Sequence, residues 1–356
     1  MRKFGVEKMT GPIASNEPRA CDGREEVLAE LLDAGLEFPP EYRGGLSNHL
    51  PMTLHALYEL GASSQRMRTF HATYMQRCLA NCLQHSFENQ APSNIDWLQF
   101  RGLPDAYPTL LAHFDEFIFR HGMEETLKKS LPHLLPGVSA AGFHGVIRTA
   151  HALQAKHPRE LAAALGYWAW RWQPLAKNSA DGQLLPFDLW SQCLVEQARE
   201  EKLQKPDALI RDCMDEASLT PTYKALAGAL APASSLEKRI AQLASFSVSR
   251  YLESRNFTVL HMVTGARALR ILLPSIDDSH QAQLLVAQCF TAAYLAAGVG
   301  PVSHIKAVDL QDWKSVMNDA MKSNNEHVIK MVYACRDEAS VYGSGQYLTA
   351  ANMALV

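Results

Sequence analysis

Apolar residues recur at three- and four-residue intervals along most of the chain, which is the period of an amphipathic α-helix. Runs of β-branched residues with strict apolar and polar alternation are essentially missing. Short segments containing proline and glycine, which end helices, separate the periodic stretches. The pattern predicts helices over residues 25–34, 52–60, 65–83, 108–121, 161–172, 187–202, 235–252, 280–297 and 326–341. The sequence therefore predicts an all-α fold.

The predicted helices are interpreted as one large domain. No repeat of fixed length runs along the chain, so the common helical-repeat arrays are not indicated. The most loop-like internal stretch, residues 177–183, has apolar helices on both sides and is not taken as a domain boundary. We expect a flexible N-terminal arm at residues 1–24, a single multi-helix domain at 25–342 and a C-terminal tail at 343–356.

Charge and composition restrict the class of partner. The chain has 34 lysines and arginines against 37 aspartates and glutamates, so a basic surface for nucleic acid is not expected. The longest apolar run, residues 284–300, is interrupted by Gln288 and Thr291 and is too short to span a bilayer comfortably. The N-terminal residues lack the apolar segment of a secretory signal, and no two of the seven cysteines form a C-x-x-C pair. We expect a cytoplasmic protein with reduced thiols that binds neither nucleic acid nor membrane.

Several common catalytic motifs are missing from the sequence. It contains no G-x-G-x-x-G following a strand, no Walker phosphate loop and no G-x-S-x-G elbow, which argues against Rossmann dehydrogenases, P-loop enzymes and the usual hydrolase fold. It also lacks H-E-x-x-H and the paired E-x-x-H motifs of di-iron bundles. Candidate chemistry must therefore come from side chains that are distant in sequence.

The fourteen histidines offer such side chains. Eight lie beside charged, proline or loop residues, where solvent exposure is expected, and His55 and His151 resemble core histidines deeper in helices. The other four lie in or near the first turn of a helix that otherwise reads as buried: His49, His144, His261 and His327. If these helix starts meet, four imidazoles form one nitrogen-rich pocket.

Such a pocket favours a metal ion. The positive end of a helix disfavours protonation of an imidazole, so the ring stays neutral and keeps a lone pair to donate. Imidazole nitrogens suit iron, copper, zinc and nickel, whereas calcium and magnesium prefer oxygen ligands. The alternative for each histidine is a helix cap or a core residue.

Three charged residues accompany the candidate ligands. Lys330 follows His327 by three residues and projects from the same helical face. A lysine suits a metal pocket if its pKa is lowered, or if it reacts with carbon dioxide to give a carbamate. Arg148, one turn after His144, and Arg267 are candidates to hold an anionic group of a substrate, or else to form surface ion pairs.

Five segments of the chain resemble the questin oxidase-like family. They are NHLPMTLHALYELGA (48–62), WLQFRG (97–102), GFHGVIRTAHAL (142–153), FTVLHMVTGARAL (257–269) and NEHVIKMVYAC (325–335). The resemblance extends over residues 25–342. It implies an all-helical enzyme that tailors aromatic polyketides, notably by oxidative ring opening, at a mononuclear non-haem iron site built from histidines and a modified lysine.

Transferred to this chain, the resemblance implies His49, His144, His261 and His327 as iron ligands and Lys330 as a carbamylated ligand. The family is linked to NADPH-dependent oxygenation, and since this chain shows no nucleotide motif, NADPH would act as an external reductant. We expect an Fe(II)-dependent oxygenase of a small aromatic substrate and dioxygen, with Lys330 and Arg148 as catalytic side chains. Two alternatives are a zinc-type hydrolase or lyase at the same cluster, and a non-enzymatic helical ligand-binding protein whose histidines cap helices.

Overall fold

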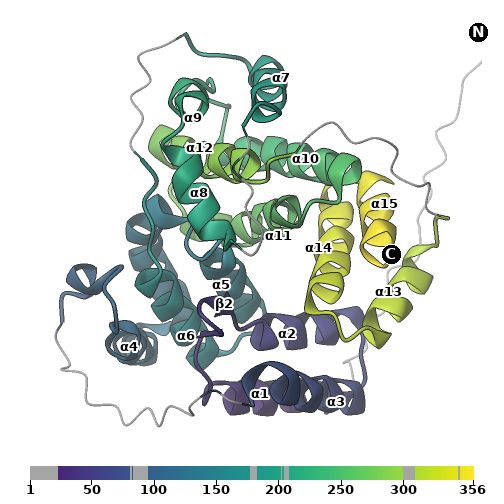
Figure 1. The fold of residues 1–356 in the computed structure, drawn as a ribbon. Helices are drawn as coiled ribbons and strands as arrows, with labels where there is room; N and C mark the ends of the chain where they lie inside the picture. The colour runs from purple at the N-terminus through teal and green to yellow at the C-terminus, as the bar shows by residue number, and fades with distance from the viewer. Residues whose placement is uncertain are drawn as a thin grey trace, which may run out of the picture.

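The computed structural model describes residues 23–80, 82, 95–176, 183–201, 203, 208–299, 309–343 and 345–356. This part of the chain is almost entirely helical, which confirms the predicted all-α class (Figure 1). The helices are α1 (Arg24–Gly35), α2 (Leu50–Leu60), α3 (Ser64–Tyr74), α4 (Tyr107–Leu134), α5 (His144–Gln154), α6 (Pro158–Trp170), α7 (Phe187–Ala198), α8 (Ile210–Ser218), α9 (Pro221–Leu226), α10 (Leu236–Ser254), α11 (Phe257–Leu272), α12 (His280–Ala296), α13 (Trp313–Lys322), α14 (Glu326–Tyr342) and α15 (Gly345–Ala354). Short 3₁₀ turns cover Trp97–Phe100, Leu135–Gly137 and Leu273–Ser275, and a π-helical turn covers Met75–Leu79.

A small hairpin connects α1 to α2. Its strands are β1 (Glu41–Tyr42) and β2 (Leu46–Ser47), paired antiparallel with Glu41 opposite Ser47. Gly45 in the turn has a φ of +119°, which favours glycine, and it lies so close to α8 that a Cβ there would stand 2.9 Å from Leu209 Cδ1. Two-residue strands are too short to show a period in the sequence, which is why the hairpin is not predicted.

The helices that position the candidate site form the centre of the molecule. α2, α5, α11 and α14 contact one another in a closed ring, with α6, α10, α12 and α15 packed around them (Figure 1). One hydrophobic core runs through the described helices, from Leu28 in α1 to Met353 in α15. None of the helices in the described part of the chain combines the length and apolar character needed to cross a bilayer.

Several predicted boundaries change. Residues 343–356 are not a tail, because α15 packs on α10 and α14 and buries Tyr347 and Met353. The predicted helix 108–121 ends at Gly122, whose φ of +79° breaks α4, but the chain then continues in helical form to Leu134. The stretch 65–83 is helical as α3 and then passes into the π-turn. The expected arm at 1–24 lies outside the described residues, except for Gly23 and Arg24, which begin α1.

Candidate metal centre

Four helices meet at their N-terminal ends, and each brings one histidine to the meeting point. His49 immediately precedes α2, His144 is the first residue of α5, and His327 is the second residue of α14. His261 lies one turn into α11. Because these helices contact one another in a ring, the structure brings together the four histidines that their sequence positions singled out.

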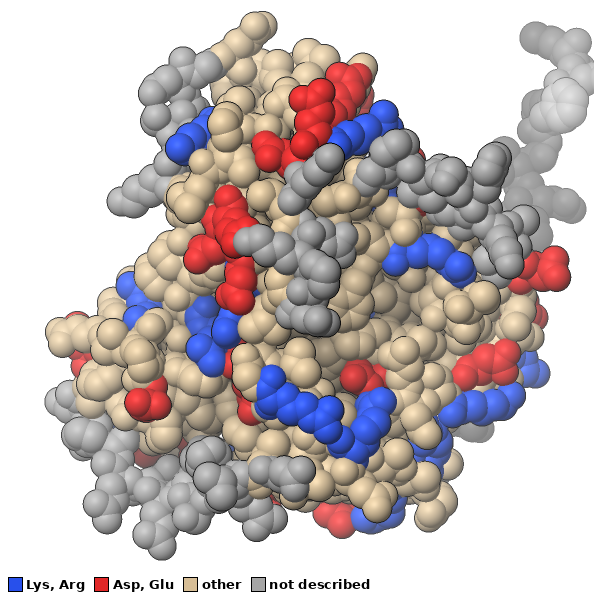
Figure 2. Space-filling view, viewed as in Figure 1, with Lys and Arg blue, Asp and Glu red and all other residues tan. Residues whose placement is uncertain are grey.

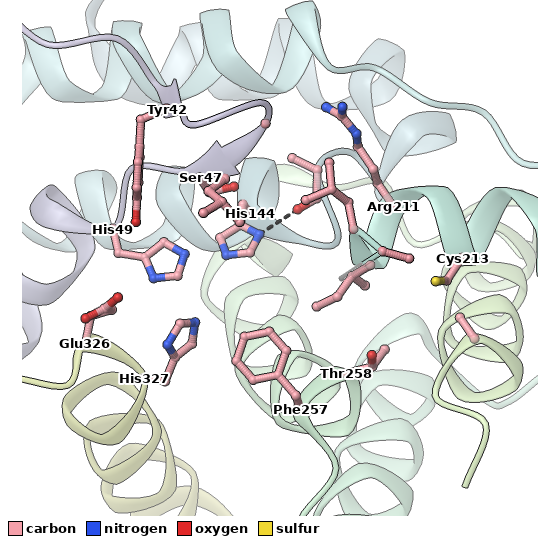
Figure 3. Close-up of a pocket in the computed structure, with 17 residues that line it drawn as sticks. Tyr42, Ser47, His49, His144, Arg211, Cys213, Phe257, Thr258, Glu326 and His327 are labelled. Carbon is pink, nitrogen blue, oxygen red and sulfur yellow. Dashed lines mark hydrogen bonds between the residues drawn. The ribbon is translucent and has the colours of Figure 1, made fainter. Parts of the chain in front are cut away.

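The imidazoles follow the same closed ring as their helices. The ring centroids of His49 and His144 are 4.7 Å apart, and those of His144 and His261 are 4.8 Å apart. Those of His261 and His327 are 5.5 Å apart, and His327 closes the ring on His49 at 4.5 Å. His327 is partly buried and the other three are buried. Figure 3 shows three of them, His49, His144 and His327, at one end of a pocket.

Hydrogen bonds fix which nitrogen of two rings carries the proton. Nδ1 of His144 lies 2.5 Å from the carbonyl oxygen of Ala141, and Nδ1 of His261 lies 2.8 Å from that of Phe257. Because a carbonyl only accepts, these rings donate from Nδ1 and keep a lone pair on Nε2. Among the described residues, each of the four rings has one buried nitrogen without a hydrogen-bond partner, namely Nδ1 of His49 and Nε2 of His144, His261 and His327.

These four nitrogens are candidate metal ligands, and those of His49 and His327 lie in a group of ligand atoms within 4.8 Å of one another that Glu326 completes. A buried polar atom without a partner costs about 1–3 kcal/mol, so four of them on neighbouring rings need a compensating interaction. Coordination to a metal supplies one, because neutral imidazoles suit iron, copper, zinc and nickel. Donation of the second ring N–H to a backbone carbonyl is also the usual arrangement behind a metal-bound histidine.

Burial keeps the four imidazoles uncharged. It is the largest cause that lowers the pKa of His49, His144 and His327 well below the ordinary value, and neighbouring imidazoles and Lys330 add to it. Burial followed by the charge of Lys330 lowers the pKa of His261 to about 3. Metal binding requires neutral rings, so the cluster is in the correct protonation state at neutral pH.

Lys330 lies within the same part of the core. Its side chain is buried on α14, three residues after His327, and burial lowers its pKa to about 7. Within the described part of the chain it makes no ion pair or hydrogen bond. A large fraction of this amine is therefore uncharged at neutral pH, as a nucleophile or a ligand must be.

Glu326 is a potential ligand that the sequence did not indicate. Ligand atoms of Glu326, His49 and His327 all lie within 4.8 Å of one another, and Figure 3 shows the three side chains facing each other. One carboxylate oxygen of Glu326 pairs with Arg77 Nη2 at 2.5 Å. An acidic residue in the first turn of a helix is common for dipole reasons alone, so this position carried no specific signal.

A left-handed turn orients His144. Ala141, Gly142 and Phe143 have φ values of +50°, +62° and +71° in succession, a conformation that costs about 1–2 kcal/mol for each residue other than glycine. The Phe143 ring is fixed against α11, where a Cβ on Gly265 would stand 2.7 Å from Phe143 Cδ1. Packing between α5 and α11 thus holds the strained turn that places the His144 ring.

We expect Gly265→Ala to destabilise the protein by about 1–3 kcal/mol, because the added methyl group overpacks against the Phe143 ring. In an unobstructed helix the same change is stabilising by up to about 1 kcal/mol. Chemical denaturation measures the difference. The matched control is Gly35→Ala in α1, where the new Cβ would stand 3.7 Å from Leu50 Cδ2; equal effects of the two changes would contradict the proposed packing constraint.

A pocket of about 290 Å³ opens beside the imidazoles (Figure 3). Its lining is mainly apolar and comes from the hairpin, the left-handed turn and the starts of α8 and α11. The lining residues are Tyr42, Gly45, Leu46, Ser47, His49, Ala141, His144, Ala208, Leu209, Ile210, Arg211, Cys213, Phe257, Thr258, Ala296, Glu326 and His327. An apolar cavity with a few polar groups at one end is the usual form of a small-molecule site.

The arginines predicted to hold the substrate do not reach this pocket. Arg148 forms a buried two-point ion pair with Glu160 on α6, at 2.6 and 2.9 Å. Arg267 is bound to Asp337 and Tyr333, at 2.7 Å in each case. Spacing placed Arg148 one turn from His144, but its side chain turns toward α6. The prediction that Arg148 is catalytic therefore lacks support from its position, and neither ion pair is a surface pair.

Three further histidines are buried and form hydrogen bonds within the core. Nδ1 of His55 and Nδ1 of His151 are 2.9 Å apart and hydrogen-bonded, with both rings buried. His157, expected in solvent, is buried and caps α6 by accepting from the Glu160 N–H at 3.0 Å.

The four central histidines do not cap their helices. Asn256 caps α11 and Asn325 caps α14. His49 occupies the cap position of α2, and Phe143 that of α5, but neither side chain accepts a capping hydrogen bond. The capping role in the non-enzymatic alternative is therefore wrong.

Comparison with models of protein families gives a match. The sequence model of a protein family described as questin oxidase-like matches residues 46–335, a range that includes all four histidines, Glu326 and Lys330. No protein of curated function matches the chain.

Proposed function

This chain belongs to the questin oxidase-like family, and we propose that it is a non-haem iron-dependent oxygenase acting on an aromatic or polyketide-like secondary metabolite. The family points to an oxidoreductase acting on polyketide-type compounds. The observation that carries the finer proposal is the set of four buried imidazole nitrogens without partners. We assign His49, His144, His261 and His327 as ligands of iron(II).

When bound, iron(II) supplies one-electron chemistry with dioxygen, which amino-acid side chains lack. The residues of the chain bind the substrate and exclude water. Phe257 and Ile210 present apolar surface to an aromatic ring, and the hairpin residue Leu46 covers the same cavity. Since the sequence has no nucleotide-binding fingerprint, electrons would come from an external reductant such as NADPH.

We further propose that Lys330 carries a carbamate. The lone pair of the neutral Nζ attacks the carbon of carbon dioxide, a C–N bond forms, one C=O electron pair moves to oxygen, and Nζ loses a proton to water. The product has a negative charge in place of a positive one, which suits a neighbour of a metal cation. The lowered pKa of the amine, about 7, supplies the neutral nucleophile at ordinary pH.

Carbon-13 NMR tests the carbamate. After equilibration with ¹³C-bicarbonate, we expect a lysine carbamate resonance that is strong above pH 7 and declines as the pH falls through the pKa of the amine, because the protonated amine does not react. Lys330→Met, which keeps the length of the side chain, should lack the resonance. A resonance that persists in Lys330→Met would assign the carbamate to another lysine.

The proposed function itself is tested by elemental analysis and by an oxygen-dependence assay on the purified protein. We expect iron near one atom per chain, and oxygen uptake in the presence of an aromatic polyketide and a reductant. Zinc at the same cluster would activate water instead. Turnover that continues undiminished without oxygen would overturn the oxygenase and favour the hydrolase or lyase.

A further inference from the structure

One buried carboxylate joins the hairpin to two helices beside the pocket. Glu41 in β1 accepts hydrogen bonds from the Tyr167 hydroxyl and from Arg171 Nε, both at 2.9 Å, and from Arg171 Nη2 at 2.5 Å. Arg211 is a second arginine at the same carboxylate, but its Nη1 lies 3.5 Å from Oε1, at the limit of a hydrogen bond. Glu41 is thus satisfied mainly by Arg171 and Tyr167.

Arg211 combines a fixed backbone with a weakly held side chain. Its carbonyl oxygen accepts from Gln173 Nε2 at 3.0 Å. The other contact that the guanidinium makes with a carboxylate of the described residues, from Nε to Asp212 Oδ1, is 3.3 Å long and reaches a side chain that is 61% exposed. Hydrogen bonds between arginine and an anion are normally about 2.7–2.9 Å long. Arg211 therefore has donors that a better-placed anion would engage.

The two ends of the pocket differ in their chemistry, with Arg211 at one end and the imidazoles at the other. Arg211 lies at the start of α8, away from His327 and Glu326 (Figure 3). Among the lining residues that the structure describes, it is the only lysine or arginine. Its Nη2 lies against the hairpin turn, 3.1 Å from where a Cβ on Gly45 would stand. At the other end, the charge of Glu326 is already neutralised by Arg77.

Other charges near Arg211 face solvent. Figure 2 shows acidic side chains gathered over α8, and basic side chains along the lower part of the same face. The acidic residues of α8 are Asp212, Asp215 and Glu216, all exposed. An exposed ion pair contributes little to stability, so Asp212 holds the Arg211 guanidinium only weakly against an anion in the pocket.

We propose that Arg211 binds an ionised acidic group of the substrate, a carboxylate or phenolate carried by an aromatic ring system, and that this contact directs the ring toward the imidazoles. The inference rests on the proposed function in taking the pocket as the site of an aromatic substrate. It makes Arg211 a substrate-binding residue that selects acidic over neutral aromatic compounds.

Two probes of the same shape test this selection. We would titrate the full-length protein with 2-naphthoate and with its neutral counterpart 2-naphthamide by calorimetry, at fixed salt and pH 7.5. Wild type should bind the acid at least about tenfold more tightly than the amide, the increment of one charge-assisted hydrogen bond. Arg211→Gln should lose this preference and bind the amide unchanged, and Arg211→Lys should restore part of it.

Arg43→Gln is the matched control, since Arg43 lies in the same hairpin as Glu41 and donates to the Arg77 carbonyl oxygen but does not line the pocket. It should keep the preference for the acid. Metal content is measured in every variant, so that a lower affinity for the acid is not mistaken for the effect of a lost metal ion. Equal loss of both probes in Arg211→Gln, or an unchanged preference, would overturn the proposal while leaving the oxygenase intact. A metal-free wild type that still prefers the acid would overturn the oxygenase alone.

Discussion

His261→Ala is expected to lower the affinity for iron by more than about 100-fold and to abolish oxygen uptake. Loss of a hydrogen-bond partner behind a metal ligand already costs about 10–100-fold in metal affinity. His261 has a buried Nε2 without a partner, on a ring that adjoins His144 and His327. Elemental analysis of the purified variant and oxygen-electrode measurements give the two readouts. Circular dichroism should show that the variant still folds, because the surrounding core of α11 is unchanged.

The matched control for this variant is His55→Ala. His55 and His261 are both about 1% exposed, but His55 pairs with His151 rather than with the central ring. We expect His55→Ala to destabilise the protein and yet retain its iron. If His261→Ala keeps a full complement of iron, or if both variants lose it equally, the assignment of His261 as a ligand is wrong.

The metal-free protein is expected to unfold steeply in mild acid. Burial is the main cause that lowers the pKa of eight described imidazoles, and six of them belong to the central ring and the neighbouring histidine pair: His49, His55, His144, His151, His261 and His327. Below the ordinary pKa of about 6.5, these histidines are protonated in the unfolded chain but remain neutral in the folded protein. Each such histidine therefore costs about 1.4 kcal/mol of stability per pH unit, and six together cost about 8 kcal/mol per unit.

The pH window follows from these shifts. The contribution of these histidines to stability is complete above pH 6.5 and is lost as the pH falls toward their folded pKa values, which are about 3 for both His55 and His261. Domains are stable by about 5–15 kcal/mol, so the chelated protein should unfold within about two pH units below 6.5. Circular dichroism against pH measures the midpoint, and bound iron should move it lower. A metal-free protein still folded at pH 4 would show that these rings are not held neutral.

The sequence predicted the features that come from a regular spacing of apolar residues or from residues of one type at equivalent places in several helices. Helical spacing found the central helices, and the shared placement of four histidines at helix starts predicted that they would meet. Nothing in that spacing predicted the hairpin at Glu41–Ser47, because its strands are only two residues long. The left-handed conformation of Phe143 could not be predicted either, since phenylalanine rarely adopts a positive φ. Its packing against Gly265 compensates for the strain of the turn.

Side-chain direction was the main limit on predicting the site. Arg148 is correctly placed one turn from His144, but whether it faces the pocket or α6 depends on Glu160, which lies on another helix. Arg211 was missed because it belongs to a short helix that was not predicted and reaches the pocket through contact with the hairpin. Tertiary contacts between segments distant in sequence decide both cases.

The closed ring of α2, α5, α11 and α14 also sets the time at which the centre forms. His49 enters with the second helix and His327 with the fourteenth, so a nascent chain on the ribosome presents at most three of the four imidazoles until α14 has emerged. Long-range closure of this kind is the slow part of folding. For the proposed iron centre, metal loading would therefore follow synthesis of nearly the whole domain.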